Sequence, residues 1–145
     1  MGFGMGAAIG SKLANPKKDV VLITGDGSFR MNCHELLTVA SQDLPIICFV
    51  MKNHVLGMVH QWQKLFFKRR FSATDIPDVL DHKKLCEAVG LNGYFADDIE
   101  ELKESISKAR AAKKGAVIVC NVEPEENVWP IVPPGDAIFN FRMEE

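Results

Sequence analysis

Short apolar runs alternate along the chain with stretches whose apolar residues recur at helical spacing. Three runs, residues 20–23, 46–51 and 116–120, have the length and composition of strands buried on both faces of a sheet. Helices are expected between and around them, over residues 4–13, 32–43, 57–67, 82–89 and 99–114. Strands that alternate with helices predict an α/β domain with an open parallel sheet and right-handed crossovers.

Two of the expected helices carry clear signs of how they start, end and pack. Asp98 with Glu101 three residues later forms a capping box, and Gly115 is expected to end the helix that follows. The apolar stripe of this helix consists of Ile99, Leu102, Ile106 and Ala109. The helix that begins near residue 32 should turn Leu36, Leu37 and Ala40 inward. From residue 123 the chain is rich in proline and looks extended, so we divide it into a domain, 1–122, and a tail, 123–145.

Composition places the chain among ordinary globular domains. Its 145 residues are 47% hydrophobic and 25% charged, with a formal net charge of -2, so neither nucleic acid nor an anionic membrane is expected as a partner. The longest apolar run, Ile46 to Met51, is far shorter than the roughly 20 residues of a membrane helix. Cysteines are widely spaced and form no CxxC pair, which favours a reducing compartment and predicts a cytoplasmic protein.

The glycines near the N-terminus fit a dinucleotide-binding pattern, G-x-G-x-x-A, over residues 2–7. That motif has meaning only between a strand and a helix, and Met1 alone precedes it here. Glycines that allow close helix packing are the favoured interpretation. His34, His60 and His82 lack metal-ligand spacing, and Lys64, Lys68, Arg69 and Arg70 are expected to form a solvated basic face.

A second glycine-rich segment, Gly25-Asp26-Gly27-Ser28, directly follows a predicted strand. Ligands bind at the carboxyl ends of strands in open parallel sheets, and glycine lets the backbone approach a phosphate. The Asp26 carboxylate would repel a bare diphosphate and therefore implies a bridging cation such as Mg²⁺. Asn53 follows the next strand and could supply a second oxygen. Taken separately, the two sites also fit an Asp-Gly turn and a turn-forming asparagine.

The Gly-Asp-Gly segment followed by Asn53 resembles the signature of enzymes that bind thiamine diphosphate. The wider context is similar to one family among them, acetohydroxyacid synthase, also called acetolactate synthase, from Met1 to about Gly135. The segments that carry this resemblance are residues 1–4, 7–10, 14–16, 25–29, 56–59, 61–63 and 132–135. They correspond to the diphosphate-binding domain near the C-terminus of the catalytic subunit. The expected fold is therefore the thiamine-diphosphate-binding fold, without its first strand, which would lie before Met1.

The resemblance implies a role for several residues of this chain. Asp26, the Asn53 side chain and the backbone carbonyl of Val55 would bind magnesium. Met58 and Trp62 would line the substrate channel, where Trp62 helps to admit the second 2-oxo acid. As residues four apart on a helix, they also fit a place in the core. The residues expected around the cofactor are Met1, Gly25, Gly27, Ser28, His54, Gly57 and Met58.

The resemblance also implies parts of the enzyme that this chain does not contain. In the family a pyrimidine-binding domain supplies the glutamate that activates the cofactor, and a further domain binds FAD. We therefore expect homo-oligomeric assembly in the intact enzyme, and no acetolactate synthesis from this chain by itself. Two departures from the family pattern stand out: Lys52 replaces an asparagine beside Asn53, and Met5-Gly6 replaces Leu-Pro.

Two other functions remain open on the sequence. The first is another thiamine-diphosphate enzyme, such as a pyruvate oxidase or a 2-oxo acid decarboxylase, which the Gln61-Trp62 pair disfavours. The second is a non-catalytic interaction module that keeps the fold without the complementary domains. Binding of thiamine diphosphate separates the second possibility from the enzymes.

Overall fold

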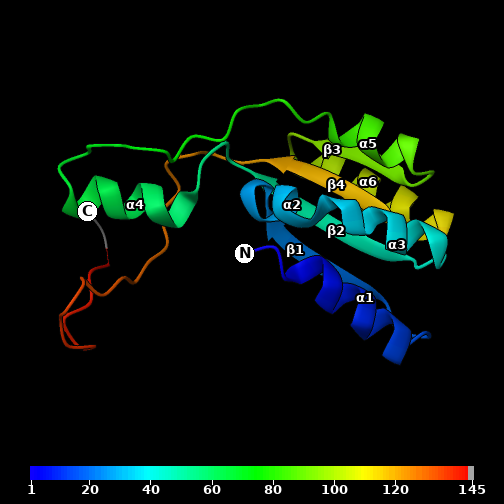
Figure 1. Ribbon diagram of the computed structural model, residues 1–145, viewed down its shortest axis with the longest axis horizontal. Helices are drawn as coiled ribbons and strands as arrows, with labels where there is room; N and C mark the ends of the chain where they lie inside the picture. The colour runs from blue at the N-terminus through cyan, green and yellow to red at the C-terminus, as the bar shows by residue number, and fades with distance from the viewer. Residues whose placement is uncertain (144–145) are drawn as a thin grey trace. The chain divides into compact units, whose positions relative to one another are not determined.

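The computed structural model describes residues 1–143 and divides them into two compact units (Figure 1). The first unit consists of residues 1–54 and 77–122. The second unit consists of residues 55–76 together with the C-terminal segment from residue 123. Within the described residues, no helix is long and apolar enough to cross a membrane.

The first unit is built on a four-stranded sheet in which every pairing is parallel. The strand order is β1-β2-β4-β3, as Figure 1 shows. The strands are β1 (Val20–Gly25), β2 (Ile46–Lys52), β3 (Asn92–Ala96) and β4 (Ala116–Asn121). The predicted parallel α/β class is confirmed, and three of these strands were expected from their apolar runs. The fourth, β3, was missed because its first two residues, Asn92 and Gly93, are depleted in strands.

Helices cover the two faces of this sheet unequally. One face packs against α1 (Gly4–Ala14), α2 (Asp26–Asn32), α3 (Leu36–Ser41) and α5 (His82–Ala88). Their buried residues meet Cys48, Val50 and Val119 of the strands in one apolar cluster. The other face carries only α6 (Ile99–Ala112), whose Ala109 packs with Ile118 in a second cluster.

The helical segment after β1 differs in two ways from its expected form. It begins at Asp26, directly after the strand, and passes through a 3-10 turn, Cys33–Glu35, before α3. Within α3 the buried residues are Leu36 and Val39, whereas Leu37 is exposed, so the expected inward position of Leu37 is wrong. The 3-10 turn winds more tightly than an α-helix and changes which residues face the sheet.

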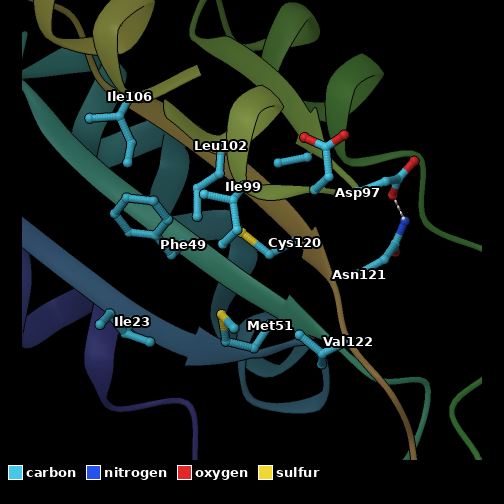
Figure 2. Close-up of a pocket in the computed structure, with 12 residues that line it drawn as sticks. Ile23, Phe49, Met51, Asp97, Ile99, Leu102, Ile106, Cys120, Asn121 and Val122 are labelled. Carbon is cyan, nitrogen blue, oxygen red and sulfur yellow. Dashed lines mark hydrogen bonds between the residues drawn. The ribbon is translucent and has the colours of Figure 1, made fainter. Parts of the chain in front are cut away.

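Strand β1 is not buried on both faces, contrary to the expectation from its sequence. Its even-numbered residues face the α1 side, while Val21 and Ile23 on the other face are exposed, Ile23 to 71%. Figure 2 shows Ile23, Phe49 and Met51 lining a hollow of about 550 Å³ against the residues of α6. In the described chain α6 covers β3 and β4, so it leaves the β1 side of this face open.

The ends of α6 show one confirmed prediction and one error. Asp98 caps the helix by accepting a hydrogen bond from the Glu101 backbone N–H at 2.8 Å, and Glu101 accepts one in turn from the Asp97 N–H at 2.9 Å. The helix ends at Ala112 and is followed by Lys113 in the left-handed conformation, with φ 48°, so it does not extend to Gly115. Gly115 instead permits close packing, since a Cβ there would lie 2.6 Å from Val39 Cγ1.

Loss of the α6 cap should have a moderate effect on stability. We expect Asp98→Ala to lower the free energy of unfolding by about 1 kcal/mol, because an N–H of the first turn loses its acceptor. Asp98→Asn keeps an acceptor of the same shape and should stay close to wild type. Chemical denaturation of both variants measures the difference, and equal stability of the two would show that the cap does not contribute.

The second unit contains one helix, α4 (Gly57–Phe66), and irregular segments that hydrogen-bond to it or to each other. Val55 pairs with Asp75 in an isolated antiparallel bridge. In the C-terminal segment, Ile131 and Arg142 exchange two backbone hydrogen bonds of 2.8 and 3.0 Å. The two buried residues of α4, His60 and Gln61, are polar, so side-chain hydrogen bonds connect this helix to the other segments of the unit.

Candidate functional site

The turn after β1 places a buried carboxylate at the carboxyl end of the sheet. Asp26 is only 4% exposed and is the first residue of α2. Its Oδ1 accepts a hydrogen bond from the Gly27 N–H at 2.8 Å, and its Oδ2 accepts one from the His54 N–H at 2.9 Å. A carboxylate has about four acceptor positions, so two such bonds leave capacity for a ligand.

The bond from His54 joins two segments that sequence reasoning had brought together. His54 follows Asn53 directly after β2, and β2 pairs with β1 in the register Gly25 to Met51. The turn that carries Asn53 is therefore fastened to the Asp26 carboxylate. His54 itself has a positive φ of 61°, a backbone strain of the kind that is concentrated at functional sites.

An ion pair that was not predicted lies beside this turn. Lys52 Nζ is 2.9 Å and 3.0 Å from the two carboxylate oxygens of Asp78. The hydrogen bond from Lys52 lowers the pKa of Asp78 below its ordinary value, and the charges of Lys52, His54 and His82 act in the same direction. The extra positive charge that Lys52 brings to the site is therefore matched by a neighbouring carboxylate.

The N-terminal segment is attached to α2 through Gly2. Its N–H donates to Ser28 Oγ at 2.8 Å, and its carbonyl accepts from Asn32 Nδ2 at 3.1 Å. Gly2 has a φ of 77°, and a Cβ there would lie 3.3 Å from Met31 Cβ, so glycine suits this position. These contacts fix the chain next to the exposed Met1. Gly4 lies against Leu22, as close helix packing predicted.

A histidine in the first unit has an unusual environment. His82 is 3% exposed, and neither ring nitrogen makes a hydrogen bond within the described structure. Its ring lies 5.5 Å from that of Phe29, one turn after Asp26 on α2. Burial lowers the pKa of His82, and the charge of Lys52 lowers it further. The carboxylates of Asp78 and Asp26 oppose these effects, as does the Leu80 backbone, which lies near the ring without meeting hydrogen-bond geometry.

The remaining predicted site residues belong to the second unit. They are Val55, Gly57, Met58 and Trp62. Met58 and Trp62 lie on α4 with 50% and 37% of their surface exposed, so the interpretation of this pair as core residues is wrong. The Trp62 ring meets Phe66 edge to face, with centroids 5.8 Å apart.

One of the charged residues near α4, Lys64, is paired rather than solvated, whereas Lys68, Arg69 and Arg70 are exposed as expected. Glu125 accepts from Lys64 Nζ at 2.7 Å and lies 3.2 Å from His60 Nε2. His60 stacks on Phe71 at 4.1 Å between ring centroids, and its Nδ1 is 3.4 Å from Thr74 Oγ1. Hydrogen bonds from Lys64 and then His60 lower the pKa of Glu125. The expectation that Lys64 belongs to a solvated basic face is therefore wrong.

The residues at the carboxyl end of β1 and β2 fit a hard cation that is shared with phosphate. Within residues 1–143, no group of three or more His, Cys, Asp or Glu side chains could hold a metal ion. A site with one carboxylate, an amide and phosphate oxygens suits Mg²⁺, which retains several non-protein ligands. The space beside Gly25 is open, with no atom within 4 Å of the position of a Cβ.

Fold and site together define an open parallel α/β domain of the class in which ligands bind at the carboxyl ends of the strands. Comparison with known proteins is more specific: the chain belongs to the thiamine pyrophosphate enzymes, and residues 1–120 match their C-terminal TPP binding domain. Thiamine pyrophosphate is another name for thiamine diphosphate. The resemblance inferred from the sequence is thereby confirmed.

Similar proteins with curated names are acetolactate synthase large subunits. The chain is 40% identical over 145 residues to "Acetolactate synthase isozyme 2 large subunit" of Escherichia coli, covering all of this chain and 26% of that protein. It is 38% identical over 141 residues to the probable large subunit of Methanocaldococcus jannaschii, covering 97% and 24%. The chain thus spans about a quarter of the length of these relatives.

A solved structure with the same fold comes from another thiamine-dependent enzyme. It is the thiamine diphosphate-dependent 4-hydroxybenzoylformate decarboxylase of Rhodococcus jostii RHA1, with a TM-score of 0.79 and 26% sequence identity. The match covers 85% of this chain and 23% of that protein. The expected thiamine-diphosphate-binding fold is therefore confirmed.

Several residues that shape the site were not found from the sequence. They are Asn32, Asp78, Gln61 and Gln63, together with the packing of His82. Most of them act through a contact with a distant segment, which no local pattern reveals; Gln63 pairs with Ser72, nine residues away. The Gln-Trp-Gln sequence was the one available signal, and it was used only as a mark of the family.

Proposed function

We propose that this chain binds thiamine diphosphate through Mg²⁺ as the diphosphate-binding domain of an acetolactate synthase. The observation that carries the proposal is the hydrogen bond from the His54 N–H to Asp26, which joins the two turns expected to hold the cation. The intact enzyme would condense pyruvate with a second 2-oxo acid in branched-chain amino-acid biosynthesis. Its catalytic chemistry would make it a transferase.

The residues of the proposed cofactor site are the ones that the family resemblance implies. Asp26 and the side chain of Asn53, from the first unit, bind Mg²⁺, and the carbonyl of Val55 adds a third oxygen. The backbone around the diphosphate is that of Gly25, Gly27, Ser28, His54, Gly57 and Met58, with Met1 near the thiamine rings. The bound cofactor would supply the electron sink for decarboxylation of a 2-oxo acid.

The substrate side of the site is proposed to lie along α4. Met58 and Trp62 are partly exposed on this helix, as a channel lining requires. An indole and a thioether offer a flat and a flexible apolar surface to the side chain of the second 2-oxo acid. We infer that Trp62 helps to select that substrate.

Catalysis would need parts beyond this domain. We propose that the chain works with a pyrimidine-binding domain, which supplies the activating glutamate, and with an FAD-binding domain, in a homo-oligomer. Acetolactate formed from pyruvate, thiamine diphosphate and Mg²⁺ by this chain alone would contradict that requirement. A 2-oxo acid decarboxylase is the second candidate, favoured by the structural likeness to a decarboxylase. Acetolactate or an aldehyde as the product of the chain combined with these domains would decide between the two.

Calorimetric titration with thiamine diphosphate, in the presence of Mg²⁺ or of a chelator, tests the cofactor proposal. We expect binding that depends on Mg²⁺ and is weakened roughly tenfold or more by Asp26→Asn, because the cation loses a charged ligand. Asparagine keeps an oxygen that can accept one of the two backbone hydrogen bonds, so the turn should persist.

Asp43→Asn provides a matched control, since Asp43 is an exposed carboxylate in the turn after α3. It should bind the cofactor as wild type does. Binding that is equally strong with the chelator, or unchanged in Asp26→Asn, would overturn the magnesium site. No binding by the folded wild-type chain would favour a non-catalytic interaction module.

A further inference from the structure

The two glutamines that flank Trp62 each pair with the backbone of another segment. Gln61, which is 2% exposed, donates from Nε2 to the Val128 carbonyl at 2.9 Å. Its Oε1 accepts from the Val128 N–H, also at 2.9 Å. The carboxamide therefore pairs with both polar groups of one residue, as a neighbouring strand would.

Gln63 makes the same kind of pairing with a different segment. Its Oε1 accepts from the Ser72 N–H at 2.7 Å, and its Nε2 donates to the Ser72 carbonyl at 3.1 Å. This pairing is exposed, whereas that of Gln61 is partly buried. α4 is thus connected on either side of Trp62 to the C-terminal segment and to the segment that follows the helix.

These pairings restrict the rotation of α4 about its own axis. Successive helical residues are turned by about 100°, so Met58 and Trp62, four apart, point within about 40° of each other. With Gln61 buried against Val128, the face that carries this pair stays exposed. The edge-to-face contact of Phe66 with the Trp62 ring supports the ring along the helix.

We propose that Gln61 and Gln63 are positioning residues that together fix the orientation of Trp62. This inference rests on the proposed role of Trp62 in the substrate channel and deepens it. The two carboxamides hold the helix at the residues immediately before and after the indole. Substrate selection by Trp62 then depends on backbone contacts made by its neighbours, which do not touch the substrate themselves.

The test uses the full chain labelled with 5-fluorotryptophan, with Trp129→Phe to assign the two ¹⁹F resonances. Wild type should give one narrow Trp62 resonance. Gln61→Met keeps the length and helix preference of the side chain but removes both hydrogen bonds. We expect its Trp62 resonance to shift and broaden, and exchange of the Val128 amide hydrogen to accelerate roughly five- to tenfold.

Three further variants separate positioning from a general loss of structure. Gln63→Met should change the Trp62 resonance and accelerate exchange at Ser72, while Val128 keeps its protection. Gln61→Glu retains the acceptor for the Val128 N–H but places a buried carboxylate oxygen against the Val128 carbonyl, and should disturb Trp62 at least as much as Gln61→Met. Gln42→Met, at an exposed glutamine after α3, should leave Trp62 as in wild type.

An unchanged Trp62 resonance in both Gln61→Met and Gln63→Met, with circular dichroism like that of wild type, would overturn the proposal. If Gln61→Met does not fold, the Trp62 resonance of Gln63→Met, whose pairing with Ser72 is exposed, serves as the test in its place. A thiamine diphosphate titration of the same samples tests the cofactor role independently. If the cofactor does not bind but the ¹⁹F changes appear as expected, the result contradicts the proposed function and leaves the positioning role of the two glutamines intact.

Discussion

Replacing His82 with phenylalanine is expected to raise the free energy of unfolding by about 1–3 kcal/mol at neutral pH, the usual cost of a buried polar group without a partner. His82 is buried against Phe29, and neither ring nitrogen makes a hydrogen bond to the residues that the structure describes. Phenylalanine has a similar shape, can keep the ring contact and has no polar atom to satisfy. Urea denaturation at pH 7.5 measures the gain.

The same substitution should also reduce sensitivity to acid. Because burial and then Lys52 lower the pKa of His82 from its ordinary value of 6.5, the unfolded chain binds a proton that the folded chain resists. The folded chain keeps this part of its stability in full above the ordinary pKa of 6.5. It loses that part as the pH falls through the lower pKa of His82 in the folded state. The advantage of His82→Phe over wild type should therefore increase as the pH is lowered from 7.5 to 5.

His34→Phe is the matched control, since the His34 side chain is 68% exposed. It should change stability by no more than about 0.5 kcal/mol and leave the pH dependence nearly as in wild type. A His82→Phe protein that is less stable than wild type, with the same pH profile, would show that the buried imidazole does not carry the cost of an unpaired polar group.

Gly93→Ala should lower the free energy of unfolding by about 1–3 kcal/mol, the usual cost of forcing extra atoms into a packed interior. A Cβ at Gly93 would lie 2.8 Å from the Cα of Lys83 and 3.3 Å from the Cβ of Cys86. Since these atoms belong to or adjoin the backbone of α5, no side-chain rotation relieves the overlap. Helix α5 would have to move away from β3. Thermal unfolding followed by circular dichroism measures the loss.

Gly10→Ala tests the same chemical change where there is room for it. Gly10 lies within α1, and no atom lies within 4 Å of the position of its Cβ. Alanine there should stabilise the protein by about 0.5–1 kcal/mol, because glycine is the poorer helix former. Destabilisation of equal size in the two variants would show that packing against α5 is not the cause.

The sequence predicts the sheet well where both faces of a strand are covered. β2 and β4 are continuous apolar runs, and the structure places them at the centre of the sheet. At the edges the prediction fails in two different ways. β1 has the same composition but one open face, and β3 begins with Asn92 and Gly93, so its pairing depends on β4 rather than on its own propensity.

For the candidate site, local sequence identifies the residues at the ends of the strands but few of their partners. Asp26 and Asn53 could be found because a parallel sheet brings such ends together. The His54 N–H as the partner of Asp26 could not, because it depends on a left-handed residue after β2. The core interpretation of Trp62 failed because helical spacing does not distinguish the buried face of α4 from the exposed one.

The polar face of α4 has a consequence for how the molecule unfolds. Neither apolar cluster contains a residue of the second unit, whose buried helical residues are His60 and Gln61. Although Val55 and Ile131 are also buried there, much of its cohesion comes from carboxamide pairings and from the ion pairs around Glu125. Opening the unit should therefore expose little apolar surface. We therefore expect the second unit to open as a foldon of its own, at low denaturant and in a shallow, salt-sensitive step, before the sheet loses its hydrogen bonds.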